Sequence, residues 1–311
     1  MNDRTLVLAT RRSALALAQA RAFARDLVGR WPGLSVEELL VVTTGDKVTD
    51  VPLAQVGGKG LFTKEIEEAL AARRADFAVH SCKDVPAELS PVFAIACIPR
   101  RADPRDVVVT RGRVSLGDLP KGARVGTSSL RRAVQLSAVY PAFDIVPLRG
   151  NVDTRLRKLD AGELDAIVLA GAGLERLGLG ARVVDTLDPD VLVPAPGQGA
   201  LAIECRADDA ETHDLLAALS DPETEIAVAC ERGVMESVGG NCNVPFGAYA
   251  VRQGGALYLR AMLVTESPHA VGVRPTGDLR RLARSLPWPA SAAHAAEVGR
   301  AAGRELLRTP Q

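Results

Sequence analysis

The stretch Phe77-Ala-Val-His-Ser-Cys-Lys-Asp-Val-Pro86 is the part of the sequence from which the fold and a candidate site follow most directly. The run from Phe77 to His80 has the length and composition of a short buried β-strand, and Pro86 ends the loop after it. That loop carries three polar side chains, Ser81, Lys83 and Asp84. Because ligands of α/β sheets bind beyond the carboxyl ends of strands, we expect Asp84 to lie in a cleft that holds negatively charged groups.

The composition indicates an ordinary globular protein. The chain has 311 residues, enough for two or three domains, and is 47% hydrophobic and 24% charged. It has 38 basic and 38 acidic residues and only 4% aromatic residues, whereas nucleic-acid-binding proteins usually show a basic excess and aromatic side chains for stacking. We therefore expect no nucleic-acid partner, and any cationic site must be local.

Targeting signals and metal-site patterns are not found in the sequence. No apolar run approaches the roughly 18 residues of a membrane span, and the first residues lead directly into a predicted strand, so we expect a cytoplasmic protein that does not bind a membrane. The odd number of cysteines and the lack of C-x-x-C spacing argue against a disulfide framework or a zinc site. The cysteines are Cys82, Cys97, Cys205, Cys230 and Cys242. Four scattered histidines argue equally against a histidine metal centre, so we expect no metal.

Strands and helices are predicted to alternate along most of the chain. Apolar runs predict strands at 6–9, 39–43, 77–80, 93–98, 106–110, 145–148, 166–170 and 200–205. The alternation predicts an α/β fold with mainly parallel sheets and helices on both faces. Two linker-like stretches, near 99–104 and 193–199, divide it into two lobes on a hinge. Lobe one is predicted to comprise 1–99 and 200–219, and lobe two 100–199.

The pattern changes near residue 220, where a small C-terminal α+β domain, 220–311, is predicted. Its predicted elements are a helix at 223–238, a hairpin that turns at 252–255 and a final helix at 291–307.

Three stretches combine a strand end, hydroxyl residues and arginines. In Gly126-Thr-Ser-Ser-Leu-Arg-Arg132 the start of a helix would direct free N–H groups and the helix dipole at one anion, and arginines suit carboxylates because they donate in a bidentate manner. Thr10-Arg-Arg-Ser13 and Arg149-Gly-Asn-Val-Asp-Thr-Arg155 repeat this logic. An ordinary helix cap with surface arginines is the alternative for any one stretch, but three such stretches favour anion binding.

Three other features each leave two interpretations open. Gly57-Gly-Lys-Gly60 either cradles a phosphate or forms a flexible loop, and it lacks the order of a P-loop. Asp84 is either a surface residue paired with Lys83 or an ionised carboxylate that stabilises a developing cation. Cys242, in the Gly-rich stretch 239–247, is either a small core residue or a reactive thiol.

Seven motifs taken together resemble the porphobilinogen deaminase family, and the resemblance runs from about Leu6 to Gly247. They are Ala9-Thr-Arg-Arg-Ser13, Gly57-Gly-Lys-Gly-Leu-Phe62, His80-Ser-Cys-Lys-Asp-Val-Pro86, Gly126-Thr-Ser-Ser-Leu-Arg-Arg132, Leu148-Arg-Gly-Asn151 with Thr154-Arg155, Pro196-Gly-Gln-Gly-Ala200, and Cys242 followed by Pro245 and Gly247.

The resemblance implies a hydroxymethylbilane synthase, a transferase of tetrapyrrole biosynthesis. It implies a dipyrromethane cofactor joined to Cys242 by a thioether, four porphobilinogens condensed head to tail with loss of ammonia, and hydrolysis that releases 1-hydroxymethylbilane. It also implies three domains, two of them like the lobes of periplasmic binding proteins, and we expect a monomer. Loss of ammonia leaves a cationic azafulvene, which Asp84 would stabilise.

The family motifs also imply roles for individual residues. The cofactor-binding residues would be Ser81, Lys83, Thr127, Ser128, Ser129, Arg131, Arg132 and Arg155. The substrate and the growing chain would contact Arg11, Ser13, Arg149, Gly150, Arg155, Arg176 and Gln198. A mobile loop would include Gln55, Gly57, Gly58 and Lys59.

The chain departs from the family pattern at two positions. Gln55 stands where members often have lysine, which removes a cation from the loop, and Asn241 stands where they often have glycine. Asn tolerates the left-handed backbone better than most residues, so the turn before Cys242 can survive. A non-catalytic two-lobed protein that binds polycarboxylates or oxyanions is the alternative function.

Overall fold

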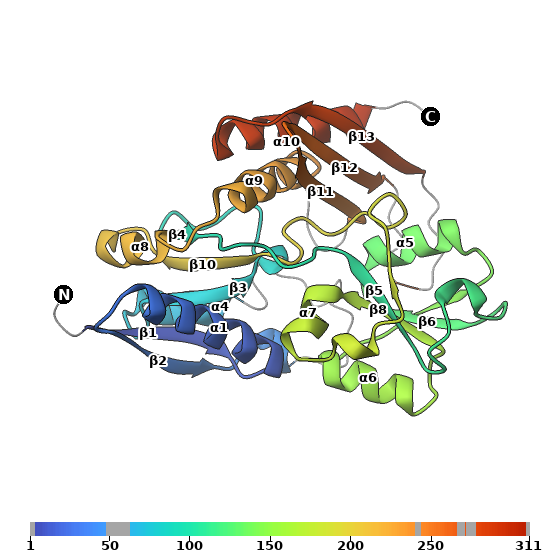
Figure 1. Ribbon diagram of the computed structural model, residues 1–311, viewed down its shortest axis with the longest axis horizontal. Helices are drawn as coiled ribbons and strands as arrows, with labels where there is room; N and C mark the ends of the chain where they lie inside the picture. The colour runs from blue at the N-terminus through green and yellow to red at the C-terminus, as the bar shows by residue number, and fades with distance from the viewer. Residues whose placement is uncertain (1–3, 48–62, 240–243, 266–270, 272–277, 309–311) are drawn as a thin grey trace. The chain divides into compact units, whose positions relative to one another are not determined.

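The computed structural model describes residues 4–47, 63–239, 244–265, 271 and 278–308, and these form two compact units (Figure 1). The first unit contains the described residues of 1–102 and 200–225, and the second those of 103–199 and 226–308. Among the described residues, no helix combines the length and the hydropathy of a membrane-spanning segment.

The first unit is built on a five-stranded sheet with the strand order β2-β1-β3-β10-β4. Its strands are β1 (Arg4–Arg11), β2 (Leu34–Val41), β3 (Phe77–Ser81), β4 (Phe93–Cys97) and β10 (Leu201–Arg206). Strand β10 is antiparallel to both of its neighbours, so the other four strands run in one direction. The mainly parallel sheet that the sequence predicts is therefore present.

Helices cover both faces of this first sheet. Helix α1 (Ala14–Arg30) and helix α8 (Ala210–Ala217) pack on one face, and α4 (Lys64–Ala71) packs on the other. Phe23 of α1 lies edge to face against Phe77 of β3, with ring centroids 6.1 Å apart. A short helix, α2 (Thr44–Lys47), follows β2, and a single 3₁₀ turn, η1 (Cys82–Asp84), follows β3.

The second unit contains a sheet of the same design with the order β7-β6-β8-β5-β9. Its strands are β5 (Asp106–Thr110), β6 (Arg124–Thr127), β7 (Asp144–Pro147), β8 (Ala166–Ala170) and β9 (Asp185–Thr186). Strand β5 is the reversed strand here, as β10 is in the first sheet. Both reversed strands directly follow the predicted linkers, which explains why each sheet departs from the parallel pattern at that strand.

Helices also cover both faces of the second sheet. Helix α5 (Leu130–Val139) packs on one face, and α6 (Val152–Asp160) with α7 (Gly171–Arg176) packs on the other. Two 3₁₀ turns, η2 (Leu116–Asp118) and η3 (Gly180–Arg182), lie in the connections.

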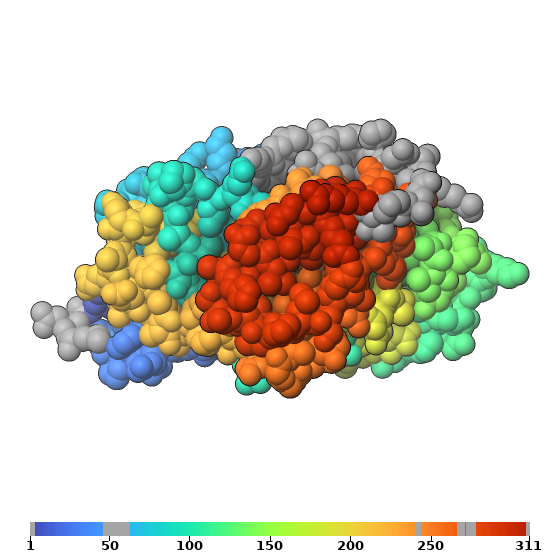
Figure 2. Space-filling model, turned by 90° about the horizontal axis from the view of Figure 1, so that it is seen from above, coloured from blue at the N-terminus to red at the C-terminus, as the bar shows by residue number. Residues whose placement is uncertain are grey.

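A third, antiparallel sheet of order β11-β12-β13 also belongs to the second unit. Its strands are β11 (Phe246–Gln253), β12 (Ala256–Val264) and β13 (Leu279–Pro287). Helices α9 (Pro222–Ser237) and α10 (Ala292–Arg308) cover one face, and residues of α5 contact the other. The outer side of α10 forms surface, drawn in red in Figure 2.

The predicted α/β class with a small C-terminal α+β part is confirmed, but several details were wrong. Strand β2 begins at Leu34, directly after Gly33, rather than near residue 39. The Thr63 hydroxyl, which the sequence predicts as the cap of the helix that follows it, makes no cap bond at the N-cap position of α4, since the Thr63 backbone is already helical. Helices α7 and α8 and strand β13 were not predicted. The division into three separate domains remains a prediction.

Candidate active site

The carboxyl ends of parallel strands carry most of the predicted site residues, within each unit separately. In the first unit, Arg11 ends β1 and Ser81 ends β3. In the second unit, Thr127 ends β6, and Arg149 and Gly150 follow β7. Strand ends of one direction meet at one edge of a sheet, so the topology gathers residues that are far apart in the sequence.

The residues Thr127-Ser-Ser129 lie directly before helix α5, and their side chains hydrogen-bond to backbone groups. The Ser129 side chain caps the helix by accepting a hydrogen bond from the Arg132 backbone N–H at 3.4 Å. The Thr127 side chain accepts one from the Ser129 N–H at 3.2 Å, and the Ser128 hydroxyl donates to the Leu148 carbonyl oxygen. The predicted hydroxyl residues therefore satisfy backbone groups at the helix start, the role of an N-cap.

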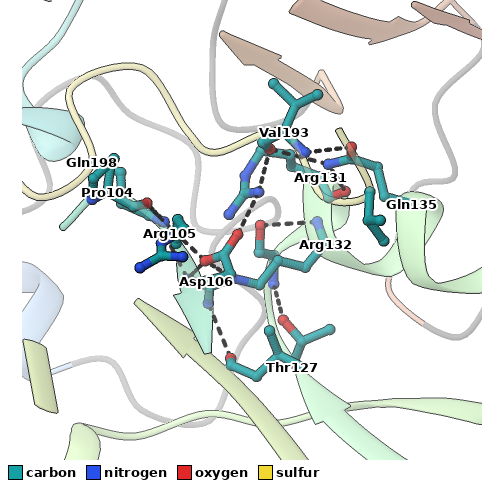
Figure 3. Close-up of polar contacts among 12 residues, drawn as sticks. Pro104, Arg105, Asp106, Thr127, Arg131, Arg132, Gln135, Val193 and Gln198 are labelled. Atoms are coloured by element: carbon teal, nitrogen blue, oxygen red, sulfur yellow. Dashed lines mark hydrogen bonds and ion pairs between the residues drawn. The ribbon is translucent and has the colours of Figure 1, made fainter. Parts of the chain in front are cut away.

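Arg131 and Arg132 in the first turn of α5 are buried and share one buried carboxylate, Asp106 at the start of β5 (Figure 3). Arg131 Nη1 lies 2.8 Å from Asp106 Oδ2. Arg132 Nη2 and Nε donate to Asp106 Oδ1 at 2.7 and 2.9 Å. The two arginines predicted to bind cofactor carboxylates thus already contact a carboxylate of the chain.

Gln198 completes this cluster from the stretch before β10. Its Nε2 donates to Asp106 Oδ1 at 2.9 Å and to the Pro104 carbonyl oxygen at 2.6 Å. Only 1% of Gln198 is exposed. Gln198, which was predicted to contact the substrate, therefore also holds the carboxylate of Asp106 in place between Arg131 and Arg132.

Sequence reasoning missed Asp106. An available signal was its place at the head of Asp-Val-Val-Val-Thr, the run 106–110, because a charge at the start of a fully buried strand needs a partner. Burial would raise the pKa of Asp106, but the charges of Arg131 and Arg132 outweigh burial and hold that pKa far below its usual range.

Arg149 and Arg155 add further positive charge beside this cluster. Burial and, to a lesser extent, the nearby charges of Arg132 and Arg149 together lower the pKa of Arg155 to about 10. Arg155 Nε donates to the Gly150 carbonyl oxygen at 2.8 Å, and Arg149 Nη1 is buried with no hydrogen-bond partner among the described residues. An arginine atom buried without a partner is a position where a ligand anion fits.

Gly150 is required where it stands. Its φ is +110°, and a Cβ there would lie 2.6 Å from Cγ2 of Thr154 in the first turn of α6. The turn that brings Arg149 to the start of α6 therefore depends on glycine.

Arg176 is the last residue of α7, and its side chain hydrogen-bonds to the backbone. Its Nη2 donates to the Gly199 carbonyl oxygen at 2.7 Å, and burial lowers its pKa. It therefore ties α7 to the Gly-rich stretch after Pro196, although a role toward substrate stays a prediction.

The acidic loop of the first unit borders a small cavity. A cavity of about 30 Å³ is lined by residues of β1, α1, α4, β3 and η1, namely Arg11, Ala16, Gln19, Thr63, Ile66, Val79, His80, Ser81 and Asp84. This volume suffices for a group the size of one water molecule.

The predicted site residues of the first unit differ in exposure and bonding. Asp84 and Lys83 are exposed. Ser81 shares hydrogen bonds with the buried Gln19, with Ser81 Oγ 3.0 Å from Gln19 Nε2. Ser13 caps α1 through the Ala16 N–H at 3.3 Å.

A buried polar pair that includes the cavity-lining His80 was also missed. His80 Nε2 lies 3.0 Å from Glu204 Oε2 of the neighbouring strand β10, and both side chains are buried. The sequence signal for this pair was His80 inside the predicted strand 77–80, because a buried histidine needs a hydrogen-bond partner.

Several predicted site residues lie outside the described residues. They are the cofactor cysteine Cys242, its neighbour Asn241, and the loop residues Gln55, Gly57, Gly58 and Lys59.

The second-unit residues fit a ligand that carries several carboxylates. Arg131 and Arg132 contact the carboxylate of Asp106, and Arg155 lies close enough to Arg132 and Arg149 for their charges to interact. These four arginines and one aspartate together carry an excess of positive charge. The unpartnered Nη1 of Arg149 points to the same chemistry.

Comparison with known proteins agrees with this geometry. A family model described as "Porphobilinogen deaminase, dipyromethane cofactor binding domain" matches residues 6–214, and the C-terminal domain model of the same family matches 225–274. Porphobilinogen deaminase of Sorangium cellulosum is 58% identical over 97% of this chain and 98% of its own length. That of Syntrophobacter fumaroxidans is 50% identical over 99% of this chain and 96% of its own length.

Among solved structures, the methionine binding protein MetQ matches with a TM-score of 0.45 and 13% identity, covering 69% of this chain and 89% of its own. The sequence matches extend over almost all of the chain, and they include both the arginine cluster and the acidic loop. This chain belongs to the porphobilinogen deaminase family.

Proposed function

We propose that this chain is a hydroxymethylbilane synthase, a transferase that condenses four porphobilinogen molecules head to tail and releases 1-hydroxymethylbilane by hydrolysis. The observation that carries the proposal is the arginine cluster at the ends of β6 and β7, in a chain of this family. Each pyrrole ring of the substrate carries an acetate and a propionate, so the ligand has the carboxylates that such a cluster binds.

The family implies a dipyrromethane group, attached through Cys242, that serves as the covalent primer for chain growth. Its two rings carry four carboxylates. Thr127, Ser128, Ser129, Arg131, Arg132 and Arg155 in the second unit, and Ser81 and Lys83 in the first, are the residues proposed to hold them. The positive end of the dipole of helix α5 adds to the attraction for a carboxylate.

Asp84 is proposed to act on the reacting substrate. Each condensation breaks the C–N bond of an aminomethyl group and forms a C–C bond to the terminal pyrrole ring. The proton lost from that ring carbon leaves with the ammonia. Positive charge develops on the substrate as ammonia departs, and an ionised carboxylate stabilises it. Arg11 lines the same cavity as Asp84, and its positive charge suits a substrate carboxylate.

The remaining proposed contacts concern the incoming substrate and the growing chain. Ser13, Arg149, Gly150, Arg176 and Gln198 are proposed to contact it, and residues Gln55 to Lys59 are proposed to form a mobile loop. We further propose that the protein is a cytoplasmic monomer that acts without metal.

Intact-protein mass spectrometry tests the function. The purified enzyme should exceed the mass of its sequence by two pyrrole units, and Cys242→Ser should remove that increment. Added porphobilinogen should then be converted to 1-hydroxymethylbilane. An unmodified, folded chain that binds anions reversibly and makes no product would favour a non-catalytic polycarboxylate-binding protein instead.

Variants separate cofactor binding from turnover. Asp84→Ala should keep the mass increment but lose turnover by about 100-fold or more, as expected when charge stabilisation in the transition state is removed. Glu88→Ala, which removes another exposed carboxylate of the same loop, is the matched control and should keep most of the rate. Arg131→Leu and Arg132→Leu should lower the fraction of protein that carries the cofactor. Normal rates in Asp84→Ala would remove Asp84 from the mechanism.

A further inference from the structure

Two arginines and one aspartate form a buried group with a net positive charge in the second unit. Arg131 and Arg132 are 5% and 6% exposed, and Asp106 is fully buried. Burying a charge is costly unless an opposite charge and hydrogen bonds compensate it. Asp106 is the carboxylate that both guanidinium groups contact, so it compensates one of the two buried positive charges.

Arg131 and Arg132 differ in how many of their N–H donors bond to other groups of the protein. Arg132 directs Nε and Nη2 to Asp106, Nη1 to the Val168 carbonyl oxygen at 3.2 Å and Nη2 also to Gln198 Oε1 at 3.5 Å. A guanidinium has five N–H donors, so Arg132 spends most of its donors inside the protein.

Arg131 retains more capacity for a ligand. Its side chain bonds to described residues through Nη1, which donates to the Val193 carbonyl oxygen at 2.6 Å and pairs with Asp106. Its Nε and Nη2 groups supply three further N–H donors. An arriving carboxylate would therefore find one uncompensated positive charge and the spare donors of Arg131.

Asp106 itself is held from three directions. It belongs to β5, it is bonded to α5 through the arginines, and Gln198 Nε2 donates to its Oδ1 at 2.9 Å (Figure 3). Gln135 of α5 reinforces the arrangement, since its Oε1 accepts from the Val193 N–H at 2.8 Å. Both guanidinium groups contact this carboxylate, Arg132 through two hydrogen bonds to Oδ1 and Arg131 through an ion pair with Oδ2.

We propose that Asp106 is a positioning residue that orients Arg131 and Arg132 for a ligand carboxylate and compensates their charge while no such ligand is bound. This inference deepens the proposed function, on which the identity of the ligand rests. It makes Arg132 mainly a structural partner of Asp106 and Arg131 the principal ligand contact of the pair.

The test compares four proteins produced in cells that cannot make porphobilinogen, so that no cofactor is attached. They are the wild type, Asp106→Asn, Arg132→Gln and the double variant with both changes. Asp106→Asn keeps the shape of the side chain but leaves two buried charges uncompensated, so its Tm should fall by about 6–10 °C. The double variant again buries one net positive charge, as the wild type does, and should recover at least half of that fall.

Two additions make the result specific. Asp160→Asn removes the acid of an exposed ion pair in the same unit, at 2.6 Å from Arg182, and its Tm should change by no more than about 1 °C. After incubation with porphobilinogen, intact mass gives the fraction that carries the cofactor. The difference in Tm between Asp106→Asn and wild type should then shrink, because cofactor carboxylates replace the missing charge.

Each outcome decides the inference. A Tm of Asp106→Asn within 2 °C of the wild type, taken as about the experimental scatter, would overturn it. The inference would also be overturned if the fall in Tm of the double variant equalled the sum of the falls of the two single variants, because additive effects mean that the two charges do not compensate each other. If Asp106→Asn does not fold, a folded double variant supports charge compensation and an unfolded one opposes it. If the wild type acquires no cofactor mass, the proposed function fails while the cofactor-free comparison still tests Asp106.

Discussion

Asp106 and Glu67 are carboxylates whose pKa values shift in opposite directions, and their neighbours explain why. Burial raises the pKa of both, but at Asp106 two arginines outweigh burial. At Glu67, on α4, burial has the largest effect, and the charge of Glu204 raises the pKa further. Burial therefore acts to raise the pKa of both carboxylates, and the charges nearby decide the final direction of each pKa shift.

Glu67 predicts a pH-dependent stability. Its pKa is raised in the folded protein, so between the unfolded and the folded pKa the folded state binds more protons, and stability falls as pH rises through that window. Glu67→Gln removes this cost, so its Tm at pH 7 should exceed that of the wild type by on the order of 1 °C. The gain should vanish near pH 4.

Thermal unfolding between pH 4 and pH 8 measures this effect. Glu68→Gln, which changes the exposed next residue of the same helix, is the control and should show no such pH-dependent gain. A gain of Glu67→Gln that is equal at pH 4 and pH 7 would contradict the assignment.

The described cysteines predict a simple labelling pattern. Burial raises the pKa of the Cys97 and Cys230 thiols to about 12 and that of Cys205 to about 11, and Cys82 is buried as well. Thiols with such pKa values are almost entirely protonated at pH 8 and react slowly. Cofactor-free native protein should therefore expose one reactive thiol, which we assign to Cys242.

Titration with a thiol reagent at pH 8 checks this. Cys242→Ser should label at no site when native and at the four remaining cysteines once unfolded. Rapid labelling of a second thiol in the native wild type would show that one of the buried cysteines is accessible.

At the level of elements, the contact between α9 and α10 depends on glycine. A Cβ added at Gly299 of α10 would lie 1.9 Å from the Cys230 carbonyl oxygen of α9, and one added at Gly233 would lie 2.2 Å from the Ala296 carbonyl oxygen. Both obstacles are backbone atoms, which cannot rotate away. The two helices thus pack against each other directly while they cover the third sheet.

This contact predicts opposite effects for one substitution at two helical positions. Gly299→Ala must push α9 and α10 apart, so the free energy of unfolding should fall by about 1–3 kcal/mol. Gly29→Ala in α1 meets no atom within 4 Å and should raise the free energy of unfolding by about 0.5–1 kcal/mol through helix propensity. Urea unfolding of both variants measures the two values, and a neutral Gly299→Ala would refute the close contact.

For the chain as a whole, the first unit is assembled from segments that are distant in the sequence. Strand β10 lies between β3 and β4 in the sheet, although about a hundred residues separate it from either. All six of its residues are buried. The first 102 residues alone therefore lack an inner strand of their own core.

Fragments make this dependence measurable. Residues 1–102 alone should remain largely unfolded, whereas 1–102 joined to 200–225 by a flexible Gly-Ser linker of about 20 residues should fold cooperatively. Circular dichroism during urea unfolding distinguishes the two. Cooperative unfolding of 1–102 alone would show that β10 is dispensable.

Local patterns in the sequence predicted most of the elements and supplied the candidate site residues. Strands 106–110 and 166–170 and the final helix, predicted at 291–307, were correctly predicted because apolar spacing is a property of short segments. The arginine-bearing strand ends were found for the same reason. Strand β13, whose residues alternate too weakly, was missed.

What the sequence alone determined was the order of most strands and helices, the family and the identity of the candidate residues, because these depend on neighbours along the chain. What required the folded chain was the reversal of β5 and β10 and the pairing of Arg131 and Arg132 with Asp106. Residues 106 and 131 are brought together only when β5 enters the sheet beside β8. A buried charge and its partner are a property of packing in three dimensions, and no local pattern encodes which partner it finds.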